Sequence, residues 1–76
     1  MYHAMLRDRL DKARKLVARD ERAVAQQQEF VIELARDGYK TQDAQRLLGL
    51  FEDLRVMHIG DQRWLEKELA QHSGPS

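Results

Sequence analysis

Hydrophobic residues recur along the first half of the chain at alternating steps of four and three, the spacing of one helix face. The positions on this line are Leu6, Leu10, Ala13, Val17, Asp20, Val24, Gln27, Val31 and Leu34. In the second half the same alternation runs through Ala44, Leu47, Phe51, Leu54, His58, Asp61 and Leu65. Unbroken spacing of this kind is typical of the seam of a left-handed helix pair. The pattern predicts an all-α fold, a long antiparallel helical hairpin that resembles a short coiled coil.

One short interruption separates the two predicted helices. Gly38 suits the left-handed conformation that follows a helix C-terminus, and Tyr39 can then contact Leu34 as in a Schellman motif. Thr41 is a favourable N-cap for the second helix, and Asp43 lies in its first turn. The predicted elements are a helix over about 2–37, a turn at 38–40 and a helix over about 41–71.

The predicted hairpin is a single domain over residues 1–72, followed by a disordered tail at 73–76. A turn near Tyr39 pairs positions whose numbers sum to about 78, which places Asp20 opposite His58. Glycine inside a helix costs about 1 kcal/mol relative to alanine. A break at Gly60 would give three helices instead of two, but the seam continues past it without a change of phase, and we expect two.

A second line of hydrophobic residues flanks the predicted seam on one side, and we call it the apolar stripe. It consists of Leu16, Ala23 and Phe30 in the first helix and Leu50, Met57 and Trp64 in the second. One hairpin cannot bury both its seam and this stripe, and an exposed patch of this extent usually marks an interaction surface. We therefore expect the stripe to be the interface of a homodimer in which two hairpins form a four-helix bundle. Docking on a different protein is the alternative, and packing on a third helix requires the break at Gly60.

Polar residues interrupt the predicted seam at Asp20, Gln27, His58 and Asp61. Because a buried carboxylate is costly unless it is paired, we expect Asp20 to contact His58. The interpretation we favour is a polar layer that fixes the register of the helices. The alternative function is a metal- or pH-responsive bundle that uses Asp20, His58 and Asp61. The order His58-x-x-Asp61 differs from the Glu-x-x-His of known helical-bundle metal sites.

Composition narrows the classes of function. The chain has 76 residues and no cysteine, which excludes disulfides and thiolate zinc sites. Its thirteen basic and thirteen acidic residues cancel, which argues against a dedicated nucleic-acid binder. Charge is nevertheless uneven, because residues 1–22 carry seven basic and four acidic residues and residues 23–76 carry six and nine. The basic residues of 7–22 scatter around the helix and alternate with acids, as on a solvated face.

Other features argue against membrane and enzymatic roles. No run of hydrophobic residues approaches a membrane span, and Arg7, Asp8 and Arg9 lie where a signal peptide is apolar. No serine, cysteine or glycine-rich loop lies near His58 to act with it in catalysis. We expect a cytoplasmic, non-enzymatic protein that binds no cofactor, nucleic acid or membrane.

The central stretch resembles a group of short, uncharacterised bacterial helical proteins with an "RDG-aromatic/His-x-T" turn. The residues that carry this resemblance, within about 20–70, are Arg36-Asp37-Gly38-Tyr39, Thr41, Ala44, Leu47-Leu48, Phe51-Glu52, His58, Asp61 and Leu65. The resemblance implies a helical hairpin and a bacterial origin, and it implies no activity. The self-association expected from the stripe predicts a small scaffold or regulatory module for protein–protein interaction.

Overall fold

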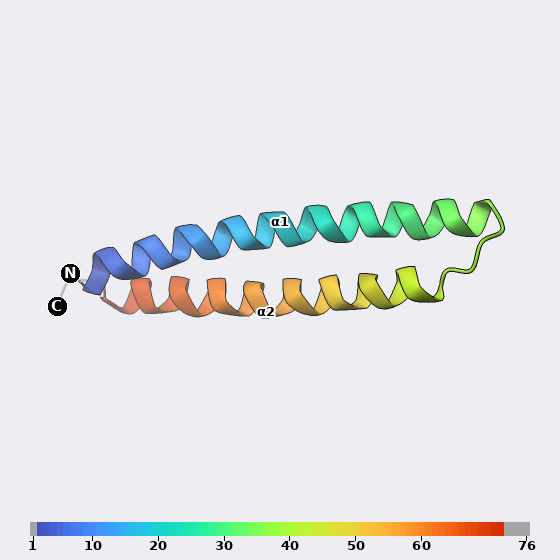
Figure 1. The fold of residues 1–76 in the computed structure, drawn as a ribbon. Helices are drawn as coiled ribbons and strands as arrows, with labels where there is room; N and C mark the ends of the chain where they lie inside the picture. Colours follow the sequence, from blue (N-terminus) through green and yellow to red (C-terminus); the bar gives the residue numbers. More distant parts are fainter. Residues whose placement is uncertain (1, 73–76) are drawn as a thin grey trace.

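The structure, a computed structural model, describes residues 2–72, which form two helices and the turn between them. Helix α1 spans Tyr2–Arg36 and helix α2 spans Gln42–His72. The two helices lie side by side and antiparallel over their whole length (Figure 1). No strand occurs within 2–72, and the predicted all-α helical hairpin is confirmed. Both helices lie within one residue of their predicted bounds, and the predicted tail at 73–76 is outside the described residues.

Helix α2 is continuous through Gly49 and Gly60. The alternative with a break at Gly60 and a third helix is therefore not what the structure contains. The helix therefore tolerates the cost of both glycines, which is about 1 kcal/mol each relative to alanine.

Backbone hydrogen bonds show why the chain turns after residue 36. Gly38 has a φ of +82°, in the left-handed region. The amide N–H of Tyr39 donates to the Leu34 carbonyl at 2.9 Å, and that of Gly38 to the Ala35 carbonyl at 3.2 Å. These two bonds define the predicted Schellman motif. The Tyr39 side chain is 67% exposed, so any hydrophobic contact that it makes at the turn buries little of it.

The three glycines of the described chain should respond in opposite ways to alanine. Gly38→Ala should lower the free energy of unfolding by about 1–2 kcal/mol, because a side chain disfavours the left-handed conformation. Gly49→Ala and Gly60→Ala should each raise it by up to about 1 kcal/mol, because an added Cβ meets no atom within 4 Å there and alanine favours helix. Urea unfolding followed by circular dichroism measures all three. A stabilising Gly38→Ala would contradict this account of the turn.

The seam of α1 is as predicted, and that of α2 is correct at four of its seven positions. In α1 the predicted line is buried from Leu6 to Val24 and half-buried from Gln27 to Leu34. In α2 the seam positions Leu47, Leu54 and Asp61 are exposed, so their assignment to the seam was wrong. The other four predicted positions, Ala44, Phe51, His58 and Leu65, are buried or half-buried as expected, and Leu48, Arg55, Gln62 and Leu69 are half-buried beside them.

The physical reason is that α2 has hydrophobic residues on two adjoining faces. From Ala44, Phe51 and His58, a step of three residues leads to one flank of the helix and a step of four leads to the other. The spacing is therefore compatible with either flank facing α1. Sequence reasoning favoured Leu47 and Leu54 because they are apolar. In the structure the other flank, which includes Arg55 and Gln62, is half-buried, and the flank with Leu47 and Leu54 is exposed.

The core of the hairpin lies near the end where the first residues of α1 and the last residues of α2 lie side by side. We call this end the open end, and we call the end with residues 37–41 the turn end. Leu6, Leu10, Ala13 and Leu65 form the buried cluster, with Leu69 packed against it. Glu68 accepts a hydrogen bond from the Tyr2 hydroxyl at 3.5 Å and lies 3.3 Å from His72, whose ring meets Tyr2 edge-on. These contacts join the two helices at the open end.

Candidate functional site

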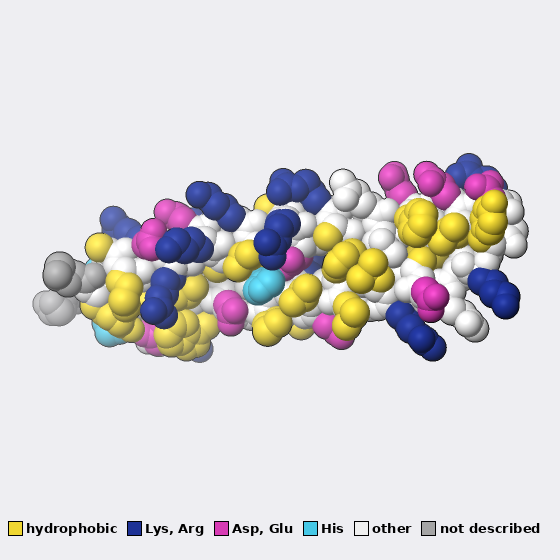
Figure 2. Space-filling view, in the orientation of Figure 1, with side chains coloured by type: hydrophobic (Ala, Val, Ile, Leu, Met, Phe, Trp, Pro, Cys, Tyr) yellow, Lys and Arg dark blue, Asp and Glu magenta, His cyan; other side chains and the backbone are white. Residues whose placement is uncertain are grey.

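The apolar stripe is uncovered in the single chain. Its residues Phe30, Leu50, Met57 and Trp64 are between 48% and 60% exposed, and Leu16 and Ala23 are half-buried. Because α2 turns a different flank toward α1 than predicted, Leu47 and Leu54 also lie at the surface beside the stripe. They are 42% and 38% exposed. We call the stripe together with these two residues the exposed apolar face. On the face that Figure 2 shows, hydrophobic side chains lie in several groups over both helices, with charged side chains between them.

The exposed apolar face has the spacing of a second seam. On α2 it occupies positions 47, 50, 54, 57 and 64, again at steps of three and four, with Asp61 between the last two. A helix with two such lines can pack against two neighbours at once, as helices do in a bundle. Sequence reasoning missed Leu47 and Leu54 as surface residues because it had assigned both to the seam.

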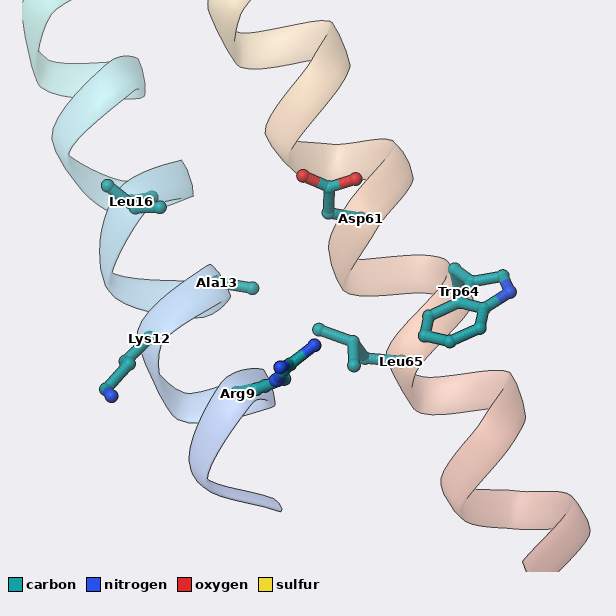
Figure 3. Close-up of a pocket in the computed structure, with 7 residues that line it drawn as sticks. All are labelled: Arg9, Lys12, Ala13, Leu16, Asp61, Trp64 and Leu65. Carbon is teal, nitrogen blue, oxygen red and sulfur yellow. The ribbon is translucent and has the colours of Figure 1, made fainter. Parts of the chain in front are cut away.

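A pocket of about 330 Å³ lies on this face near the open end. Its lining residues are Arg9, Lys12, Ala13, Leu16, Asp61, Trp64 and Leu65. Ala13 and Leu65 are buried at its base, and Figure 3 shows Arg9 extended from α1 toward Leu65. An apolar base with a tryptophan, two cations and one carboxylate around it suits an apolar side chain, and the excess of one positive charge favours an acidic neighbour. The pocket itself was not predicted, although the predicted register, in which paired positions sum to about 78, already places Ala13 opposite Leu65.

The predicted contact between Asp20 and His58 is confirmed. The imidazole Nδ1 and the Asp20 Oδ2 are paired across the two helices. The side chain of Asp20 is only 5% exposed and that of His58 is 16% exposed, so the pair is nearly enclosed. Seven residues along α1, the Gln27 side-chain amide donates to the Ala44 carbonyl at 2.9 Å. Two polar seam residues of α1 thus make specific contacts with α2, as expected of groups that fix register.

Asp61 does not join this polar pair. It is exposed and lines the pocket, where Arg9 and Lys12 are the nearby cations. Within residues 2–72 no group of three or more His, Asp or Glu side chains is placed to hold a metal ion. The structure therefore brings together two of the three candidate ligands, Asp20 and His58, and leaves Asp61 apart from them.

Comparisons with protein-family models, with curated proteins and with solved structures give no match for this chain. Neither α1 nor α2 combines the length and the hydrophobicity that a membrane-crossing helix needs. The class that the fold defines is the all-α helical hairpin, and the exposed apolar face is the feature from which function can be argued.

Proposed function

We propose that this protein is a non-enzymatic, self-associating helical hairpin that acts as a small scaffold or regulatory protein–protein interaction module. Its functional unit is a homodimer that forms a four-helix bundle through the exposed apolar face. The observation that supports this proposal is the line of exposed large hydrophobic residues on α2, interrupted at Asp61, together with the exposed Phe30 of α1.

The shape of the chain supports association. A compact domain of this length has a radius of gyration of about 11 Å, whereas the hairpin has 17.4 Å and extents of 61 × 15 × 13 Å. A compact monomer of 8.9 kDa exposes about 4,800 Å² of surface, and this chain exposes 6074 Å². The excess is larger than the roughly 800 Å² that each partner contributes to a standard protein interface.

The free energy gained by covering the exposed hydrophobic side chains also favours association. Fully burying a large hydrophobic side chain is worth roughly 1.5–3 kcal/mol, so covering the exposed half of Phe30, Leu50, Met57 or Trp64 is worth about 1 kcal/mol each. Both protomers contribute this gain. Chains of this length rarely obtain more than about 3–5 kcal/mol from a single core. Association therefore supplies stability that an isolated hairpin lacks.

Sedimentation equilibrium at micromolar concentration tests the proposal. We expect a species of twice the 8.9 kDa chain mass. A helical species that remains at the mass of one chain throughout this range would contradict self-association and leave a different protein as the partner of the face.

A further inference from the structure

We infer that the two hairpins of the dimer stack in opposite directions, with the turn end of each over the open end of the other and α1 packed on α1. This inference rests on the proposed self-association and specifies the arrangement of the second copy. The two-fold axis passes at the level of Ala23, the middle of the stripe on α1. Three features of the described chain support this arrangement, and the first two describe the same charges.

The first feature is the distribution of charge that folding produces. The Asp20–His58 pair divides the hairpin into two halves. Residues 2–19 and 59–72, at the open end, carry eight basic and five acidic residues, a net charge of +3 with histidine neutral. Residues 20–58, at the turn end, carry five basic and eight acidic residues, a net charge of −3. Opposite stacking places unlike charges together at both ends, whereas stacking of like ends places +3 on +3 and −3 on −3.

The second feature is that α1 itself carries this asymmetry. Its residues 2–19 include six basic and two acidic residues, and its residues 20–36 include two and four. In α2 the basic and acidic residues nearly cancel in each half. Antiparallel packing of α1 on α1 is therefore the arrangement that brings these unlike charges closest.

The third feature is complementary shape. Leu16 and Phe30 lie seven residues on either side of Ala23, so the proposed axis places Phe30 of one copy at the level of Leu16 of the other. Leu16 lines the pocket, and Phe30 is 48% exposed. The aromatic ring can thus enter the pocket beside Trp64. Stacking of like ends instead sets the two pockets opposite each other and leaves both unfilled.

The same axis aligns acidic residues of one copy with the cations at the pocket of the other. Positions on the two α1 helices lie at the same level when their numbers sum to 46. Asp37 then lies at the level of Arg9, and Glu33 at the level of Ala13, next to Lys12. Arg9, Lys12, Glu33 and Asp37 are all exposed in the single chain. None of the four makes an ion pair with the other helix of its own hairpin; Lys12 pairs with Asp8 of its own helix, at 3.1 Å.

Spin labels test the direction of stacking without background labelling, because the sequence has no cysteine. Ala4→Cys and Lys40→Cys place labels at exposed sites near the open end and in the turn. Ala4 is nineteen residues from the axis, so opposite stacking separates two Ala4→Cys labels by about 57 Å at 1.5 Å per residue. Stacking of like ends brings their backbones within roughly 15 Å.

Pulsed dipolar spectroscopy distinguishes every outcome. We expect the long distance in the Ala4→Cys dimer and an additional short distance when labelled Ala4→Cys and Lys40→Cys proteins are mixed. A short distance in the Ala4→Cys dimer would overturn opposite stacking while leaving self-association intact. No dipolar signal between chains would show that the dimer itself is absent, and the proposed function would fail with it.

Charge reversal gives a second test. Arg9→Glu/Lys12→Glu and Glu33→Lys/Asp37→Lys each create repulsion at both ends of an oppositely stacked homodimer. At low salt we expect the Kd of each variant homodimer to rise about 10-fold or more, since four exposed contacts change sign. An equimolar mixture should regain a Kd near that of the unmodified protein, because each variant complements the other. Stacking of like ends predicts the reverse for the homodimers, which would then associate more tightly than the unmodified chain.

Discussion

Replacing Trp64 and Met57 together by glutamate is expected to convert the dimer into monomers. Both side chains are 55% exposed in the single hairpin, so the substitutions cost its own fold little. In the dimer they place four carboxylates in an apolar contact, where burying an unpaired charge costs several kcal/mol. We expect the Kd to rise at least about 100-fold, since a buried tryptophan often contributes 2 kcal/mol or more by itself. Sedimentation equilibrium measures the change.

The chain offers a matched control for this variant. Ile32 and Val56 are 62% and 66% exposed and lie outside the exposed apolar face. Ile32→Glu/Val56→Glu therefore introduces the same charges at similarly exposed hydrophobic positions, one on each helix. We expect this control to remain dimeric and equally helical by circular dichroism. Equal dissociation of both variants would show that added negative charge, rather than the exposed apolar face, controls association.

Replacing one member of the Asp20–His58 pair should give the second large effect. The loss in the free energy of unfolding should depend on which of the two residues is replaced. His58→Leu leaves the almost fully enclosed Asp20 carboxylate without its partner, and we expect a loss of about 3 kcal/mol in the free energy of unfolding. Asp20→Leu leaves an imidazole that is 16% exposed and can keep contact with water, so we expect a loss of about 1 kcal/mol or less. Urea unfolding at fixed protein concentration measures both.

The double variant distinguishes stability from specificity. Asp20→Leu/His58→Leu replaces the enclosed pair by apolar side chains, which is often stabilising by about 1–4 kcal/mol. We expect the double variant to be more stable than either single variant and at least as stable as the unmodified chain. If the pair fixes register, sedimentation velocity should show the double variant as a mixture of oligomers. A double variant that is as unstable as His58→Leu would mean that the pair contributes stability that leucines cannot replace.

The features of the fold that the sequence predicted correctly are set mainly by interactions between residues close together in the chain. The helix bounds and the Schellman turn depend on Gly38, Thr41 and good helix formers, whose effects act within a few residues. The buried line of α1 was predictable because that helix has one continuous seam. The Asp20–His58 contact followed from the short turn, which limits the register of an antiparallel pair to a narrow range.

The candidate surface was predicted less completely. Its six stripe residues were predicted from the spacing of hydrophobic positions. Leu47, Leu54 and Asp61, however, were assigned to the seam. Those errors share one cause. Two adjoining faces of α2 have hydrophobic spacing, and only contact with α1 decides which of them is covered.

By itself, then, the sequence determined a two-helix hairpin, its turn, the seam of α1 and the presence of more hydrophobic surface than one hairpin can bury. The tertiary structure alone decided which flank of α2 is covered and the position of Asp61 at a pocket. Helical periodicity fixes which residues share a face, while packing against another helix decides which face is buried.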